Sequence, residues 1–273
     1  MSDDAPDLTM VVPTYNEREG IAELSAALFA ACGDHDIRLE LVIVDDNSPD
    51  GTGAMADELA RAQRVRVIHR RGKLGLGTAV VAGFEIASAP VVGVMDADFS
   101  HPPSLVPGLF AALRGTGADL VVASRYVPGG STPNWPLTRR LLSRLACVLA
   151  RPLSPIRDAA SGFFLLRGDV ARGVSIKAGG FKICLEIVVR AWPQHLVEVP
   201  YRFDDRELGE SKMSFREAVG YLVQLRDLYR LEWAQPRRRS RRYERLTPAA
   251  LEALISARKN TGAPAAAVLK RAD

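Results

Sequence analysis

Residues 91–98 read VVGVMDAD, an apolar run of five residues that ends abruptly in a pair of aspartates. Three more apolar runs also end in polar residues: LTMVVP (8–13), LELVIV (39–44) and LVVA (120–123). A fifth short run, VRVIH, covers residues 65–69. Between the runs lie segments with apolar residues at helical spacing, such as residues 19–31. This alternation predicts an α/β fold, in which a mostly parallel sheet is flanked by helices.

The same criteria extend the pattern along the rest of the chain. We expect further strands near residues 162–166 and 196–203, and helices at residues 52–62, 77–87, from 104 onward, 137–149, 183–192, 215–233 and 247–259. The composition changes to arginine after Pro236. We therefore expect a single catalytic domain over residues 1–235 and a basic C-terminal tail over residues 236–273, partly helical or disordered.

The amino-acid composition excludes several classes of protein. A chain of 273 residues with 47% hydrophobic and 25% charged residues can bury one sizeable core. Its three widely spaced cysteines include no CxxC pair, which argues against a disulfide framework or a zinc site. The first seven residues do not resemble a signal peptide, and the most apolar run, residues 141–153, is interrupted by arginines. We expect a cytoplasmic protein that meets a membrane only peripherally.

The net charge of +4 is concentrated near the C-terminus, where residues 237–242 read RRRSRR. A basic surface suits anionic partners, either nucleic acid or acidic lipid headgroups, and charge alone does not choose between them. A nucleic-acid-binding segment would carry aromatic residues among the charges, and only Tyr243 is nearby. We therefore expect no nucleic-acid partner.

The polar ends of the apolar runs are the candidate site, because ligands of open α/β sheets bind outside the carboxyl ends of the strands. The carboxylates of Asp96 and Asp98 repel each other unless a cation lies beside them. Mg²⁺ and Mn²⁺ bind one or two carboxylates and complete their coordination with phosphate oxygens and water. Ser100 adds a hydroxyl as a candidate third ligand. The alternative is a turn in which the aspartates cap the helix that starts near Ser104.

Asp45 and Asp46 end another strand in the same way. One of these carboxylates can accept hydrogen bonds from a base or a ribose, and the alternative is an Asx turn, chiefly for Asp45. The glycine-rich stretch at residues 73–78 fits no phosphate-binding motif and is interpreted as the entry to a helix.

A second group of residues can bind an anion. Arg206 and Lys212 lie in a polar loop and Arg125 follows a strand, so together they can hold a phosphate monoester. The alternative is that the loop charges are merely solvated. The stretch DAASGFF (158–164) adds an acid, a hydroxyl and a glycine ahead of an apolar pair.

Six motifs occur in order along the chain: VPTYNE (12–17), VDDNSPDGT (44–52), MDADFSHPP (95–103), SRY (124–126), SGF (161–163) and GESK (209–212). On these motifs the chain resembles the family-2 glycosyltransferases of GT-A fold, and within them the polyprenol (dolichol) phosphate mannosyltransferases. The likeness covers about residues 8–230. Two departures are Ser100, where family members often have Gln, and Ala160, where many have Thr.

The resemblance implies GDP-mannose as donor, a polyprenyl monophosphate as acceptor, and Mg²⁺ or Mn²⁺ as cofactor. The residues that it assigns to the guanosine are Pro13, Tyr15, Glu17, Val44 and Asp46. Those that it assigns to the diphosphate, sugar and metal are Asp96, Ala97, Asp98, Ser100 and Arg125. It assigns phosphate binding to Arg206 and Lys212, which with Asp96, Asp98 and Arg125 make up the expected catalytic set.

The reaction that this family resemblance implies needs no general base, because a phosphate monoester is already ionised near neutral pH. Its oxygen would attack the anomeric carbon with inversion. The acceptor lies in a membrane, which suggests docking to a membrane surface through residues 215–233 and the arginine cluster, or a separate membrane-spanning partner. The alternative is a core helix followed by a solvated tail, and for the helix this alternative is favoured. The alternatives are a UDP-glucose-dependent transferase on the same lipid, a protein or glycan acceptor, a nucleic-acid-binding protein, and an inactive scaffold. The last is disfavoured because Asp96, Asp98 and Arg125 are all present.

Overall fold

The computed structural model describes residues 5–174, 182–204, 215–234 and 240–261. Its strands are β1 (Leu8–Thr14), β2 (Leu39–Asp45), β3 (Val65–His69), β4 (Val91–Val94), β5 (Leu120–Ser124), β6 (Phe164–Arg167), β7 (His195–Pro200) and β8 (Arg242–Arg245). Its helices are α1 (Arg18–Gly33), α2 (Thr52–Ala62), α3 (Leu76–Ile86), the 3₁₀ helix η1 (Pro103–Leu105), α4 (Val106–Thr116), α5 (Leu137–Ala150), α6 (Gly168–Arg172), α7 (Ile183–Arg190), α8 (Phe215–Ala234) and α9 (Pro248–Thr261). The predicted α/β class is confirmed, and each strand and helix expected from the sequence is present within about two residues of its predicted start.

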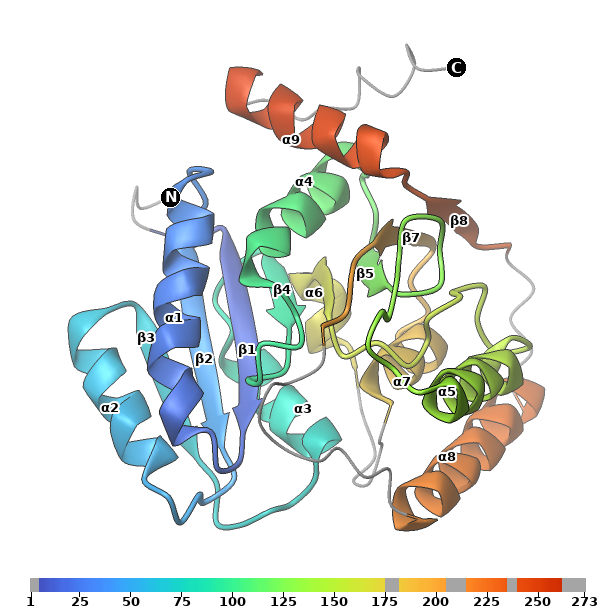
Figure 1. Ribbon diagram of the computed structural model, residues 1–273, viewed down its shortest axis with the longest axis horizontal. Helices are drawn as coiled ribbons and strands as arrows, with labels where there is room; N and C mark the ends of the chain where they lie inside the picture. Colours follow the sequence, from blue (N-terminus) through green and yellow to red (C-terminus); the bar gives the residue numbers. More distant parts are fainter. Residues whose placement is uncertain (1–4, 175–181, 205–214, 235–239, 262–273) are drawn as a thin grey trace.

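The strands form one eight-stranded sheet in the order β3-β2-β1-β4-β6-β5-β7-β8 (Figure 1). All neighbouring strands are parallel except β6, which is antiparallel to both β4 and β5. Because β4 and β5 both oppose β6, they run in the same direction as each other. The carboxyl ends of seven strands therefore lie on one edge of the sheet, and the start of β6 lies there too.

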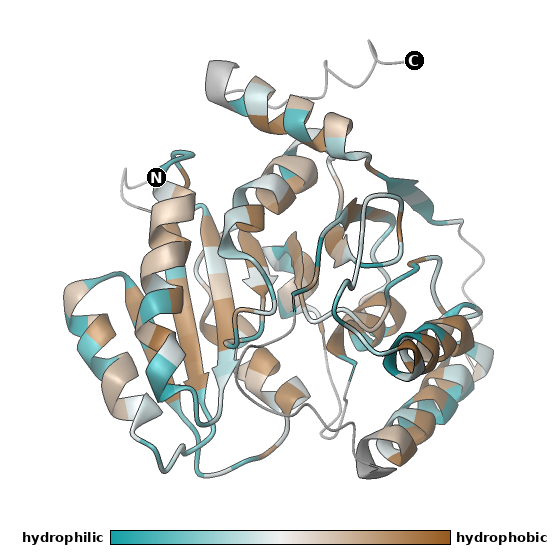
Figure 2. Cartoon of the chain, in the orientation of Figure 1, coloured by the Kyte–Doolittle hydropathy of each residue, from teal (hydrophilic) through white to brown (hydrophobic). Residues whose placement is uncertain are grey.

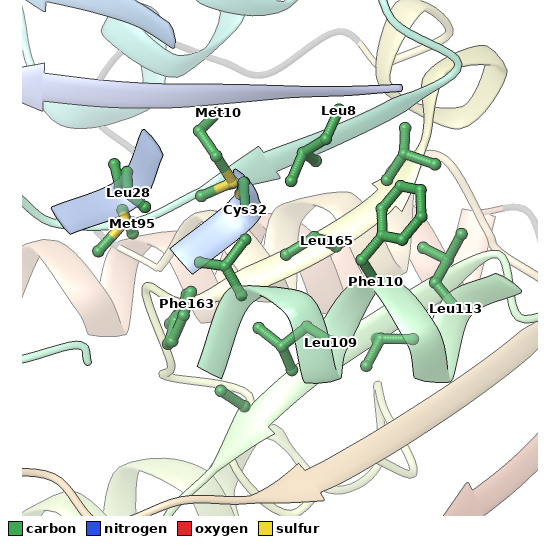
Figure 3. Close-up of a cluster of buried hydrophobic side chains, with 14 of the residues drawn as sticks. Leu8, Met10, Leu28, Cys32, Met95, Leu109, Phe110, Leu113, Phe163 and Leu165 are labelled. Carbon is green, nitrogen blue, oxygen red and sulfur yellow. The ribbon is translucent and has the colours of Figure 1, made fainter. Parts of the chain in front are cut away.

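Helices cover both faces of the sheet. The core on one face joins the strands to α1, α4 and α9, and it includes Leu28, Met95 and Phe163 (Figure 3). The core on the other face joins them to α3, α6 and α7. A third, smaller cluster packs α5 and α8 against α7. Each central strand is buried on both faces, which is why these strands are continuous apolar runs.

The described part of the C-terminal segment belongs to this core. β8 pairs with β7 in parallel, in the register His195 with Arg242 to Glu198 with Arg245. α9 packs on α4, where Leu251 and Leu254 are buried, and Arg258 donates to the carbonyl oxygen of His35. The sequence analysis predicted the helix here but not the strand. The domain boundary expected after residue 235 stays a prediction.

The three cysteines are free and buried. Burial raises the pKa of the thiols of Cys32 and Cys147 to about 12, so both stay protonated and act as small apolar side chains. Among the described residues, no helix has the length and apolar character needed to cross a bilayer.

Gly83 marks the closest approach of α3 to the sheet. A Cβ atom at this position would lie 2.3 Å from Cγ1 of Val11, which is fully buried on β1. We expect Gly83→Ala to lower the free energy of unfolding by about 1–3 kcal/mol through overpacking, measured by urea denaturation. The control is Gly33→Ala at the end of α1, where a Cβ would meet nothing within 4 Å. Equal stability losses in the two variants would contradict the close packing of α3.

Candidate active site

The strand order reverses between β1 and β4, which predicts a ligand-binding crevice at their carboxyl ends. From β1 the chain builds outward through β2 and β3, and it then returns to place β4 on the other side of β1. Such a reversal of strand order leaves a gap between the connections at the carboxyl edge, which is where ligands of open α/β sheets bind. The structure brings most of the predicted site residues to this edge: they are Pro13, Tyr15, Glu17, Val44, Asp46, Asp96, Ala97, Asp98, Ser100 and Arg125. Arg206 and Lys212 lie outside the described residues.

The turn after β4 presents two carboxylates. The side chain of Asp96 is 43% exposed, and Asp98 is partly buried. One oxygen of Asp98 accepts the backbone N–H of Ser100 at 3.1 Å, across Phe99, whose φ of 57° is left-handed. Ser100 itself is buried. The tight turn therefore holds both carboxylates at the crevice rather than along a strand.

The buried side chain of His101 holds this turn in place. Its Nδ1 accepts the backbone N–H of Asp96 at 3.2 Å, and its ring stacks on Phe163 with centroids 5.0 Å apart. Burial lowers the pKa of His101, although the nearby Asp96 and Asp98 oppose that shift. The ring is therefore neutral at pH 7, with its proton on Nε2. No histidine was assigned a role from the sequence, in which only the position of His101 three residues after Asp98 points to it.

A small pocket beside Asp96 is lined by Leu76, Ser161, Gly162 and Lys182, among others. Gly162 packs closely there, because a Cβ would lie 3.1 Å from an Asp96 carboxylate oxygen and that side chain would have to shift slightly. The pKa of Lys182 is lowered, chiefly by burial and also by Arg125. Asp96 and Asp158 only partly oppose this shift. Lys182 was missed by the sequence analysis, since a lone lysine before an apolar helix carries no signal.

Arg125 is bound tightly to Asp158 at the base of the site. Its Nε and Nη2 each donate to the Asp158 carboxylate at 2.7 Å, and its backbone N–H donates at 2.9 Å. The Asp158 side chain is fully buried and that of Arg125 is 8% exposed. Burial alone would lower the pKa of Arg125, but the carboxylate outweighs it and raises the pKa above its ordinary value. The role predicted for Arg125 at an anionic group stays a prediction.

Asp46 lies on the other side of the crevice, at the end of β2. One of its carboxylate oxygens is 2.8 Å from Nη1 of Arg70 but has no well-directed hydrogen bond within the described residues. Burial raises the pKa of Asp46, and Arg70 opposes that shift. Arg70 also donates to the carbonyl of Gly75 and the hydroxyl of Thr78, so it fixes the entry to α3. Arg70 was not among the predicted site residues, and its only signal in the sequence is the basic run at residues 70–73.

The β1–α1 turn is joined to the loop after β2 by backbone donors. The N–H groups of Asn16 and Glu17 donate to the hydroxyls of Ser48 and Thr52. Asp45 accepts both the N–H and the hydroxyl of Ser48, three residues on, so its carboxylate bonds within the loop, although not with the two-residue spacing of an Asx turn. The ring of Tyr15 remains 38% exposed, with Nζ of Lys73 4.1 Å from its centroid.

Residues 9–184 match the family profile described as Glycosyl transferase family 2. The chain belongs to this family. A dolichol-phosphate mannosyltransferase of Pyrococcus furiosus is 42% identical over 82% of this chain and 63% of its own length. A polyprenol monophosphomannose synthase of Mycolicibacterium smegmatis is 41% identical over 77% of this chain and 83% of its own. A dolichol-phosphate mannosyltransferase of Saccharomyces cerevisiae is 38% identical, over 82% and 87% respectively.

Solved structures agree on the fold. Mannosyl-3-phosphoglycerate synthase from Rubrobacter xylanophilus superposes with a TM-score of 0.63 and 16% identity, over 86% of this chain and 77% of that one. A mannosyltransferase from Pyrobaculum calidifontis, solved with GDP-Man and Mn²⁺, gives a TM-score of 0.55 and 17% identity, over 98% and 79%. The fold is GT-A, as the sequence predicted, and the protein is a glycosyltransferase.

The Arg125–Asp158 pair generates a stability prediction. We expect Asp158→Asn to lower the free energy of unfolding by about 3–5 kcal/mol, because it leaves the buried guanidinium without a counter-charge. Urea denaturation measures the loss. The control is Asp169→Asn in the exposed Arg167–Asp169 pair, where about 0–1 kcal/mol is expected. A loss in Asp158→Asn as small as that of the control would show that the buried pair does not hold the site together.

Proposed function

We propose that this glycosyltransferase moves mannose from GDP-mannose to a polyprenyl monophosphate with inversion, which gives a polyprenyl phosphate mannose. The observation that carries the proposal is the Asp96–Asp98 turn at the β1–β4 crevice, with Lys182 and Arg125 beside it. Carboxylates for a metal and cations for phosphate are the groups that transfer between two anions requires. The names of the relatives, which are mannosyltransferases or synthases of dolichol or polyprenol phosphates, support the same substrates.

On the donor side, Pro13, Tyr15, Glu17, Val44 and Asp46 would hold the guanosine. Support comes from the position of Asp46 just after the carboxyl end of β2, at the same edge as Asp96, where a carboxylate can accept hydrogen bonds from a base or ribose. The exposed ring of Tyr15 offers a stacking surface at the same edge.

The donor atoms at the β4 turn fit Mg²⁺ or Mn²⁺. Carboxylate and hydroxyl oxygens are hard ligands, and no ion pair joins Asp96 or Asp98 to a lysine or arginine within the described part of the chain. Among the described residues, no group of three or more His, Cys, Asp or Glu side chains is placed to hold a metal ion by itself, so an ion here would need ligands from the substrate. That suits an ion completed by substrate phosphate oxygens. Asp96, Asp98 and Ser100 would hold the ion, which would supply Lewis-acid stabilisation of the leaving diphosphate.

On the acceptor side, the ionised phosphate would be its own nucleophile. One phosphate oxygen would form a bond to the anomeric carbon as the bond to GDP breaks, and no proton needs to be removed. His101 does not suit a general base, because its Nδ1 is committed to Asp96 and its ring is buried. Lys182, Arg206 and Lys212 would offset the repulsion between donor and acceptor, whereas the charge of Arg125 is balanced by Asp158.

The decisive test is transfer of radiolabelled mannose from GDP-mannose to short-chain polyprenyl phosphate, with Mg²⁺ or Mn²⁺ and with EDTA. We expect metal-dependent labelling of the lipid, and a loss on the order of a hundredfold or more in Asp98→Ala. Glu23→Ala, at an exposed position on α1, is the matched control and should retain full activity. Preferred transfer from UDP-glucose would reject mannose as the sugar. Transfer from neither donor would mean either that a membrane-spanning partner is missing or that the acceptor is not a polyprenyl phosphate.

We also propose that the protein meets the membrane peripherally, at its cytoplasmic face, through α5 and the neighbouring face of α8. Six apolar side chains of α5 are 40–70% exposed: they are Leu137, Leu141, Leu142, Leu145, Val148 and Leu149. Leu222 and Trp233 of α8 are 56% and 80% exposed. The two helices lie side by side, as the hydrogen bond from Tyr221 to the carbonyl of Ala146 indicates (Figures 1 and 2). We call this set of exposed apolar residues the α5/α8 face.

Charge and position favour a bilayer as the partner of this face. Arg139, Arg140, Arg144 and Arg151 flank the leucines, as suits anionic headgroups around buried acyl chains. The inner side of α5 contacts the site: Tyr126 donates to Ser143, and Cys147 lies 3.9 Å from Asp158. A lipid-borne acceptor would thus be presented close to Arg125. The arginines at 237–239, which we expected to contribute, lie outside the described residues.

Vesicle flotation tests the α5/α8 face. We expect the double variant Leu141→Ser/Leu145→Ser to bind vesicles of anionic phospholipid at least tenfold more weakly, because burial of one leucine contributes about 1.5–3 kcal/mol. The control adds two hydroxyls at exposed positions of α1, Ala26→Ser and Ala30→Ser, and should bind like the wild type. Unchanged binding of the leucine variant would exclude this face as the contact.

A further inference from the structure

A chain of polar contacts joins the C-terminal strand to the base of the active site. It begins at Glu198 on β7, whose side chain is completely buried. The Glu198 carboxylate accepts the backbone N–H groups of Arg157 and Asp158, at 2.8 Å and 3.0 Å. Its third donor is the hydroxyl of Tyr243, which comes from β8. One of these three donors therefore comes from β8.

The three donors explain how Glu198 can be buried. A carboxylate taken out of water loses its hydration, and hydrogen bonds must replace it. The Tyr243 hydroxyl keeps its proton and donates it to this hydrogen bond, because burial and the bond to Glu198 raise the pKa of Tyr243 above its ordinary value. Loss of this hydroxyl would leave a buried carboxylate with two backbone donors only.

The loop that Glu198 holds is the one that positions the site. Asp158 turns its own carboxylate toward Arg125 and receives three donors from it. The carbonyl of Asp158 accepts the N–H of Ser161, and Ser161 and Gly162 line the pocket beside Asp96. A shift of residues 157–158 would therefore displace both Arg125 and the wall of that pocket.

We propose that Glu198 and Tyr243 are positioning residues that fix Asp158, and through it Arg125 and the Ser161–Gly162 wall, so that strand β8 is required for productive donor binding. The consequence for catalysis rests on the proposed mannosyl transfer, whereas the positioning itself does not. Neither residue touches the crevice in this arrangement. The C-terminal segment is thereby part of the active-site support, and a chain cut after residue 235 would lose it.

The test combines local amide exchange with kinetics in the full-length protein. In Tyr243→Phe we expect exchange of the Arg157 and Asp158 amides to become about tenfold faster, the loss expected when one hydrogen bond to a charged group is removed. We expect the KM for GDP-mannose to rise several-fold, with a smaller change in kcat. Glu198→Gln should move both readouts further in the same direction.

The matched control is Leu254→Ala on α9, which weakens the same C-terminal segment at a buried contact away from the 157–162 loop. It should lower overall stability without a selective change at Arg157 and Asp158 or in KM. Exchange at these two amides within twofold of wild type in Tyr243→Phe would overturn the proposal, as would an equal change in the control. If the wild type transferred no mannose, the proposed function would fail, but the exchange comparison would still decide the positioning.

Discussion

The buried pair of Arg125 and Asp158 is the interaction on which the arrangement of the site depends. Placing a guanidinium and a carboxylate out of water is unfavourable unless each is fully satisfied, and here the pair forms two side-chain hydrogen bonds and one to the backbone. That geometry ties the end of β5 to the loop before β6. Since β6 lies between β4 and β5, the same tie sets how the Asp96 turn faces the rest of the crevice.

The sequence predicted the parts of the molecule that local physics determines. Apolar runs that end in polar residues are buried parallel strands, and their carboxyl ends must share one edge. The positions of Asp46, Asp96, Asp98 and Arg125 at that edge followed from this rule. The reversed direction of β6 did not, because strand direction depends on pairing with β4 and β5 rather than on residues 164–167 themselves. β8 was missed for a related reason: the stretch RYER is polar and becomes a strand only because β7 offers a free edge.

Contacts between residues far apart in the chain likewise could not be predicted from the sequence. Arg70, His101 and Lys182 act through contacts with residues from other elements or with the adjoining turn, and their immediate neighbours give at most a weak signal of these contacts. The α5 helix shows another limit. Its periodicity correctly predicts an amphipathic helix, but the leucines face outward while Cys147 and Ala150 face inward. Periodicity identifies an apolar stripe without saying what covers it, and a stripe that the protein itself leaves uncovered marks a surface for a partner.

The balance of charge in the crevice bears on the proposed reaction. Asp96, Asp98 and Asp158 bring three carboxylates, whereas Arg125 and Lys182 bring two cations, and Arg125 is already neutralised by Asp158. Such a site would repel a nucleotide diphosphate, and it would repel a second phosphate more strongly. A divalent ion at Asp96 and Asp98 would reverse that balance, and the cations of Arg206 and Lys212 would add to the effect on the acceptor side. Ordered assembly follows from this electrostatic argument: metal and donor would bind together first, and the acceptor phosphate would approach only after the aspartates had been neutralised.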